Sequence, residues 1–139
     1  MEAAKGVGAG VGRWLLVAGW RCGMGAPEIQ DYRFGRMSVD GKRYTQDLIL
    51  LPDRVVANWW RKEGHRLDVE DLQEVFAAAP RVLVVGSGAY GLVKVPEETR
   101  RALEAAGIEL RVARTGEAWR LYNGLREKHP TAGAFHLTC

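Results

Sequence analysis

The sequence feature that most constrains the fold is the run from residue 81 to residue 91, where an apolar segment leads into a glycine-rich loop. Four consecutive apolar residues, 82–85, predict a strand buried within a sheet. Gly86, Gly88 and Gly91 then follow at the G-x-G-x-x-G spacing that lets backbone approach a pyrophosphate. The run favours an α/β fold and raises nucleotide binding as the first functional hypothesis.

Two further requirements of a dinucleotide site are not met by the sequence. The helix should open inside the glycine turn, but residues 92–95 intervene and the next helix is predicted to open only at Pro96. An acidic residue should end the next strand to hold the ribose, but residues 111–115 contain none. An arginine there could meet a 2′-phosphate, so NADP stays an alternative. The preferred interpretation is a glycine loop at the carboxyl edge of a sheet, without a cofactor.

The first half of the chain is predicted to be a meander of short strands. Residues 32–39 carry alternating apolar positions that slip near Gly35, which predicts one strand with a bulge. Asp40-Gly41 is a strong two-residue hairpin turn, because both residues tolerate the positive φ that such turns require. Further strands are predicted at residues 42–45, 47–51 and 55–60.

The second half alternates strands with helices. One helix is predicted from the N-cap Asp68 to Pro80, and another opens at Pro96 and stops at Gly107. After a strand at 108–113, Thr115 is expected to cap a helix whose inward residues are Ala118, Leu121, Tyr122 and Leu125. With a last strand at 132–137, this β-α-β-α-β pattern implies parallel pairing. The predicted class is α/β: a single three-layer domain, residues 27–139, with a mixed sheet and an N-terminal hairpin or meander layer.

Residues 1–26 do not fit that domain. They are glycine-rich, and their apolar stretch, residues 14–18, is too short to span a bilayer. Trp20 and Arg21 stand where a signal peptide would need small residues before its cleavage site. We expect a disordered extension or a start assigned too early, with Met24 as the alternative start. Weak membrane association through Trp14 and Trp20 is the minority interpretation.

Charge and cysteine content exclude several functions. Of the formal net charge of +3, Lys5, Arg13 and Arg21 against Glu2 contribute +2, which leaves +1 for residues 28–139. No basic run typical of a nucleic-acid groove remains, so no nucleic-acid partner is expected. The two cysteines form neither a C-x-x-C nor a zinc spacing. We therefore predict no metal and a reducing, cytoplasmic location.

A candidate ligand site lies where the parallel strands end. Gly86, Ser87 and Gly88 should meet the helix start at Thr115 and the strand end at His136 at one edge of the sheet. Free amides at residues 115–117 would suit a small anion. The alternative is that the glycines only turn the chain and the threonine only caps its helix.

The arguments for a functional role are weaker for the remaining candidate residues. His136 and Cys139 are three residues apart and would face opposite ways on an extended chain, so we predict no catalytic pair. Asn123 flanks an inward tyrosine, where its amide would bind backbone or, less expectedly, a ligand. Trp59 and Trp60 would face opposite ways on a strand, and an exposed tryptophan would indicate a partner surface.

An ordered set of residues also resembles a known family. The set comprises Asp40-Gly41, Tyr44, Asp47, Trp60-Arg61, His65, the segment 83–88, Val95-Pro96, Gly107-Ile108, Thr115-x-x-Ala118, Tyr122-Asn123-x-Leu125 and the ending 135–139. Together, over about residues 27–139, they resemble the Mth nine-thirty-eight domain family. The segment Lys128-His129-Pro130 departs from the family's usual basic, aliphatic entry into the last strand, which leaves the start of that strand open.

The resemblance implies a three-layer α/β domain with an added β-hairpin layer, usually in the cytoplasm. A related mitochondrial branch is implicated in respiratory complex I assembly, and no catalytic activity is established for the family. We therefore expect a non-enzymatic protein-interaction or assembly module whose protein partner is unknown. The alternative is a small-molecule or anion-binding protein, an undetected enzyme included, that uses the glycine loop.

Overall fold

The computed structural model describes residues 26–139. The expectations for the N-terminal extension, for Met24 as a start and for Trp14 and Trp20 at a membrane lie outside these residues. The strands are Ile29–Arg33 (β1), Arg36–Val39 (β2), Lys42–Tyr44 (β3), Leu48–Leu51 (β4), Arg54–Val56 (β5), Val82–Ser87 (β6), Glu109–Ala113 (β7) and Thr131–His136 (β8). The helices are the 3₁₀ turn Val69–Leu72 (η1), Gln73–Ala78 (α2), Glu97–Ala105 (α3) and Thr115–Arg126 (α4).

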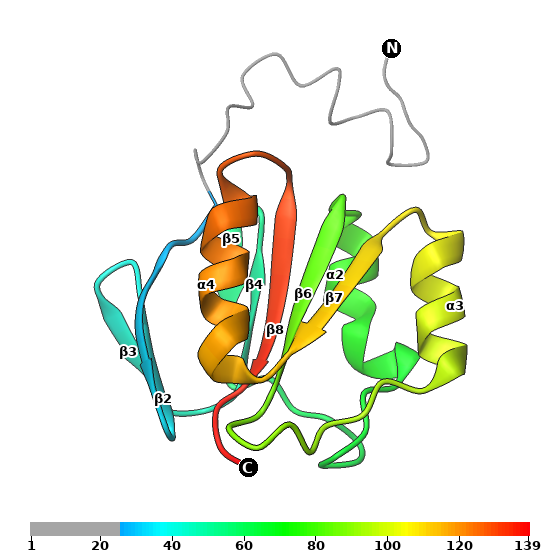
Figure 1. The fold of residues 1–139 in the computed structure, drawn as a ribbon. Helices are drawn as coiled ribbons and strands as arrows, with labels where there is room; N and C mark the ends of the chain where they lie inside the picture. Colours follow the sequence, from blue (N-terminus) through cyan, green and yellow to red (C-terminus); the bar gives the residue numbers. More distant parts are fainter. Residues whose placement is uncertain (1–25) are drawn as a thin grey trace.

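The strands form two sheets that belong to one layered domain. The larger sheet has the order β5-β4-β8-β6-β7, in which β6 runs parallel to both β7 and β8, while β4 is antiparallel to β8 and β5. The smaller sheet, β1-β2-β3, is antiparallel and lies with α4 on one side of the larger sheet (Figure 1). This arrangement confirms the predicted α/β class, the mixed sheet and the N-terminal hairpin layer.

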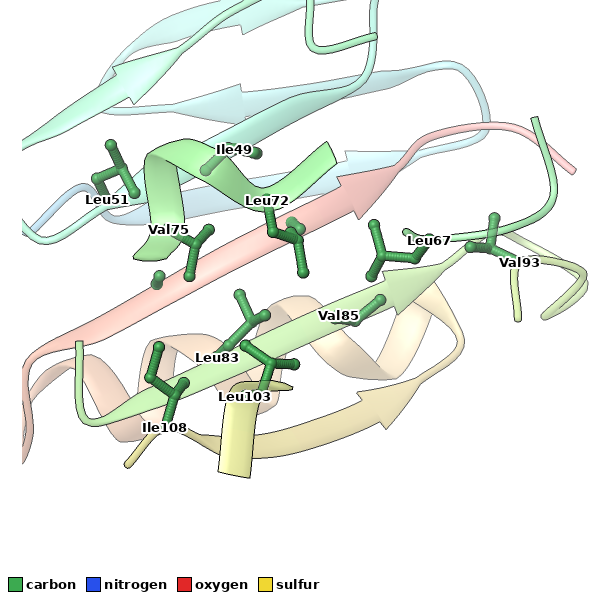
Figure 2. Packing of buried hydrophobic residues seen from close by; sticks show 12 residues of the cluster. Ile49, Leu51, Leu67, Leu72, Val75, Leu83, Val85, Val93, Leu103 and Ile108 are labelled. Atoms are coloured by element: carbon green, nitrogen blue, oxygen red, sulfur yellow. The ribbon is translucent and has the colours of Figure 1, made fainter. Parts of the chain in front are cut away.

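The larger sheet is buried on both faces. Along β4, Leu48 and Leu50 face the core shared with α4 and the smaller sheet, whereas Ile49 and Leu51 face the core under α2 and α3. A strand with two covered faces is apolar throughout, which is why residues 48–51 show no polar alternation. Figure 2 shows the second core, where Leu72 and Val75 pack across the sheet residues Leu83 and Val85.

Two predicted strands were wrong in extent. Residues 32–39 do not form one bulged strand, because Phe34 and Gly35 make a turn between β1 and β2, with Gly35 at φ 82°. Glycine reaches that φ without a steric penalty, so the slip in alternation marked a turn. The register irregularity lies instead between Ile29 and Asp31. Residues 55–60 leave the sheet after Val56, so the two tryptophans lie in a loop.

Other local predictions were confirmed. Asp40 and Gly41 take φ values of 49° and 84° in the hairpin between β2 and β3, as the two-residue turn requires. Gly107, at φ 77°, follows α3. One cap was wrong: Arg114 is the N-cap of α4, and Thr115 is its first helical residue, fully buried.

Several segments that are far apart in the sequence meet at one end of the domain. The carboxyl ends of β6, β7 and β8, the turn between β1 and β2, the loop after β5 and the C-terminal residues all lie at the lower edge of the molecule in Figure 1. We call this end the carboxyl edge.

Candidate functional site

The structure brings together the predicted residues of the glycine loop, but it joins their polar groups to one another. The Gly88 amide donates to Thr115 Oγ1 at 2.9 Å, and that hydroxyl donates to the His136 carbonyl at 2.6 Å. Ser87 Oγ donates to the Ala113 carbonyl at 3.1 Å. These bonds tie the end of β6 to α4 and to the end of β7, and they tie α4 to the end of β8.

The amides expected to hold an anion are largely occupied. The Thr115 N–H donates to the Gly88 carbonyl at 3.1 Å and the Glu117 N–H to the Arg114 carbonyl at 2.9 Å. Two of the three amides at residues 115–117 thus already donate within the chain. An anion at this helix start would compete with these internal bonds, and anion binding here stays a prediction.

The glycines have packing reasons of their own. A Cβ on Gly86 would lie 2.7 Å from the Phe135 ring and 2.9 Å from Thr115 Oγ1. Gly88 combines φ 101° with a Cβ position 2.8 Å from the His136 ring and 2.9 Å from the Cys139 carbonyl oxygen. The next helix, α3, begins only at Glu97, well after the glycine turn. The glycines therefore serve close packing in the fold, which supports the choice against a dinucleotide fingerprint.

Behind this loop lies a largely buried ionic cluster formed by Asp47, Arg61 and His136. Asp47 Oδ2 is 2.8 Å from Arg61 Nη1 and 2.7 Å from His136 Nδ1. The Arg61 side chain is only 6% exposed. The other carboxylate oxygen, Oδ1, accepts the Leu137 amide at 2.9 Å. Both oxygens of the carboxylate are thus engaged.

The cluster fixes the charge state of its carboxylate. Burial by itself raises the pKa of Asp47, but the hydrogen bonds from His136, Leu137 and Arg61 outweigh burial and lower it below its ordinary value. A carboxylate can only accept and a guanidinium can only donate, and the shorter contact of His136 Nδ1 is with Asp47. The hydrogen on Nδ1 therefore points to Asp47, which sets the orientation of the imidazole.

Arg61 is held from its other side as well. Its Nη2 donates to the Gly64 carbonyl at 2.8 Å, and its guanidinium carbon lies 5.0 Å from the centre of the Trp59 ring. Within residues 26–139, every buried side-chain nitrogen and oxygen has a hydrogen-bond partner. The cluster is therefore held mainly by internal contacts, and these stabilise the fold at this edge.

The sequence analysis missed this cluster. Asp47 and the pair Trp60-Arg61 stood among the residues of the family resemblance, but no spacing connects residues 47, 61 and 136 before the fold is known. Only the ordered resemblance could have indicated that these residues belong together.

The cluster anchors the C-terminal residues, which in turn connect two turns. The Leu137 carbonyl accepts the Gly35 amide at 2.8 Å and the Tyr32 hydroxyl at 3.0 Å. The Thr138 carbonyl accepts the Ala89 amide at 2.8 Å. Residues 137 and 138 thus hold the β1–β2 turn beside the loop that follows β6.

Those two turns expose aromatic rings. Phe34 is 58% exposed and Tyr90 is 64% exposed, and their ring centres are 6.4 Å apart. Trp60, 85% exposed, lies in the loop after β5, between Trp59, whose amide donates to the Asp47 carbonyl, and Arg61, which contacts His136 at the carboxyl edge. We call Phe34, Tyr90 and Trp60 the edge aromatics. Tyr90 was missed because it stands in a loop without periodicity, and Phe34 because it fitted the alternation of the strand predicted over residues 32–39.

Two of the predicted residues do not belong to the exposed aromatic surface. Trp59 is half-buried, and its indole N–H donates to the Asp71 carbonyl at 2.9 Å. Asn123 accepts the Ile29 amide at 3.1 Å and donates to the Ile29 carbonyl at 2.7 Å. Both polar atoms of this amide form hydrogen bonds with the backbone of β1 and so connect α4 to that strand. This is the structural role that the sequence analysis preferred to ligand contact.

Neither the surface hollow nor the titratable side chains of residues 26–139 form a recognisable ligand or metal site. An open hollow of about 280 Å³ is lined by Lys62, Arg66, Asp68, Val69, Glu70, Glu98 and Thr99, none of them a predicted ligand residue. Within residues 26–139, no three His, Cys, Asp or Glu side chains are grouped to hold a metal ion. No helix in that range is long and apolar enough to cross a membrane.

With the fold and the edge described, comparison with known proteins defines the class of protein. Residues 29–136 match a family described as a protein of unknown function (DUF498/DUF598). The chain belongs to this family.

Solved structures agree with that assignment. The Rpa2829 protein from Rhodopseudomonas palustris is 33% identical, with a TM-score of 0.65 over 78% of this chain and 81% of that one. The conserved hypothetical protein PH1505 from Pyrococcus horikoshii OT3 is 28% identical, with a TM-score of 0.69 over 81% and 99% of the two chains. A Bordetella pertussis protein described as a Mth938-like domain shares the fold at 20% identity and a TM-score of 0.64 over 80% and 85%. The resemblance to the Mth nine-thirty-eight domain family is thus confirmed.

Proposed function

We propose that this domain is a non-enzymatic protein-interaction or assembly module that binds its partner through the carboxyl edge. The observation that carries the proposal is the exposure of the edge aromatics, foremost Trp60 at 85%. Most polar groups behind them, in contrast, already form internal hydrogen bonds. Aromatic surface left in water at one end of a small domain favours association.

The chemistry of the edge suits a binding surface. Tryptophan and tyrosine are enriched among the residues that contribute most to protein association. The turns that carry Phe34 and Tyr90 are held by residues 137 and 138, so little loop ordering is needed when a partner binds.

A pull-down with matched variants tests this proposal. Trp60→Ala and the double variant Phe34→Ala/Tyr90→Ala should each lose proteins that the wild-type domain retains. Lys128→Ala, which trims an exposed side chain after α4 and outside the carboxyl edge, is the control and should keep them. If both edge variants retain every partner of the wild type, the carboxyl edge is not the binding surface.

The alternative, a small-molecule or anion-binding protein, has its own measurement. A ligand at 100 times its Kd would raise the free energy of unfolding by about 2.7 kcal/mol. Thermal unfolding with phosphate, nucleotides and carboxylates at millimolar concentration should therefore reveal such a ligand. No shift in Tm with any of them would remove this alternative. The cytoplasmic location stays a prediction beside both.

A further inference from the structure

We infer that the partner segment bound at Phe34 and Tyr90 is an acidic peptide with an apolar side chain at its centre. The inference rests on the proposed function, because it requires that the carboxyl edge binds a protein. It goes further in naming the chemistry of the partner, which follows from the charges that flank the two rings.

The ring pair supplies the apolar part of the surface. The two rings are tilted by 46° with their centres 6.4 Å apart, and more than half of each residue is exposed. They come from different segments that the C-terminal residues hold together. A Leu, Phe or Trp side chain of a partner would remove apolar area of both rings from water at once.

Arginines stand on both sides of the rings. Arg33 and Arg36 are directly paired across the β1–β2 turn and so flank Phe34. From the other side, Arg114 Cγ and Nε lie 3.4 and 3.6 Å from where a Cβ on Gly91 would be, next to Tyr90. Arginine forms two parallel hydrogen bonds with a carboxylate, which makes this frame suited to Asp or Glu.

Within residues 26–139, Arg33 alone of these three arginines forms an ion pair, so the side chains of this frame keep a net positive charge. Arg33 lies 3.5 Å from Asp31, with both side chains exposed. Arg36 and Arg114 have no ion pair within residues 26–139, and Glu117 in the first turn of α4 pairs with neither of them. Asp47 lies behind the surface, already paired with Arg61.

Other anionic partners fit this surface less well. A nucleic acid needs a continuous basic track, whereas residues 28–139 carry a net charge of only +1. An anionic lipid surface is bound through a long amphipathic face, and here the apolar part is two rings in turns. A short peptide with acidic residues on both sides of a central apolar side chain matches the size and the charge order of the frame.

Fluorescence anisotropy with defined peptides tests the inference. The probes are labelled peptides of about twelve residues with a central Leu, Phe or Trp flanked by Asp and Glu, and matched peptides with Lys in place of the acids. The acidic peptides should bind, and the Lys peptides should not. Arg36→Glu/Arg114→Glu should weaken binding by about tenfold or more, and added salt should weaken it as well.

The control reverses the same amount of charge elsewhere. Arg81→Glu/Lys128→Glu alters exposed residues outside the carboxyl edge, before β6 and after α4, and should change the affinity less than twofold. Equal losses in both double variants, or no binding of any acidic peptide, would overturn the inference. So would binding to phosphatidylserine vesicles in place of the peptides.

The outcome is separable from that of the proposed function. If Phe34→Ala/Tyr90→Ala loses its partners in the pull-down while the arginine reversal leaves them bound, the interaction module stands and the acidic partner falls. If the aromatic variants lose nothing, both proposals fall.

Discussion

Two regions at the same end of this domain use their side chains in opposite ways. In the ionic cluster, Asp47, Arg61 and His136 give their hydrogen bonds to one another and to backbone. The edge aromatics, of which Trp60 directly precedes Arg61 in the chain, leave most of their surface in water. The comparison teaches that residues with charged or reactive side chains need not be the residues that carry function. Here the polar groups hold the end of the fold, and the apolar groups remain available to a partner.

The largest effect should come from breaking the ionic cluster. Asp47→Asn replaces a carboxylate that accepts from three partners with an amide that would turn an N–H toward buried donors. Removing one partner of a buried ion pair costs about 3–5 kcal/mol, because the other charge stays buried and unpaired. We expect a loss of this size in the free energy of unfolding, measured by urea denaturation.

Asp53→Asn is the matched control for this substitution. The Asp53 side chain is 75% exposed and lies 3.5 Å from Arg54, so its loss should cost less than about 0.5 kcal/mol. The pH dependence adds a second readout. Because the folded pKa of Asp47 is lowered, its contribution is complete above the ordinary carboxyl pKa and is lost as the pH falls through the lowered value. The difference between wild type and Asp47→Asn should shrink below about pH 4. A difference that stays constant there would contradict the assigned role.

A somewhat smaller effect should follow from crowding the glycine loop. Gly88→Ala would place a Cβ 2.9 Å from two carbonyl oxygens of the C-terminal residues at φ 101°, so both strain and overlap destabilise it, by about 3 kcal/mol. Gly41→Ala has a similar φ, 84°, and no atom within 4 Å of its Cβ, so only the strain of about 1 kcal/mol remains. Urea denaturation of the two variants separates these costs. Equal losses would show that Gly88 is needed only for its backbone conformation.

The sequence allowed the layers to be predicted better than the site. Residues 82–85 and the alternating helices were sufficient for the parallel part of the sheet, since apolar runs and helix caps act locally. The ionic cluster joins positions from three distant segments, and no local pattern encodes such a meeting. Phe34 was misread for the opposite reason: it fitted the alternation of a strand, although Gly35 beside it turns the chain. Exposure of a ring in a turn becomes visible only when the neighbouring segments are in place.

Substitution of Asn123 should have an effect on stability between those expected for the two regions. The Asn123 amide makes two hydrogen bonds with the backbone of Ile29 from a half-buried position on α4. Asn123→Ala should therefore lower the free energy of unfolding by about 1–2 kcal/mol, reduced somewhat by the better helix propensity of alanine. Gln73→Ala, at an exposed position of α2, should change it by less than about 0.5 kcal/mol. If Asn123→Ala is as stable as wild type, the two hydrogen bonds contribute nothing to the free energy of unfolding, and the residue is free to serve another role.

The smallest effect on stability is expected where the effect on binding is greatest. The domain holds two comparable ring pairs: Tyr122 and Phe135, fully buried with centres 5.8 Å apart, and Phe34 and Tyr90, exposed with centres 6.4 Å apart. Phe135→Ala should cost about 3–5 kcal/mol, because it leaves a cavity in the core. Phe34→Ala/Tyr90→Ala should cost less than about 1 kcal/mol in the same urea denaturation, since water already contacts both rings. A large loss of stability in the double variant would mean that the exposed rings serve the fold, and the carboxyl edge would no longer stand apart from the cluster behind it.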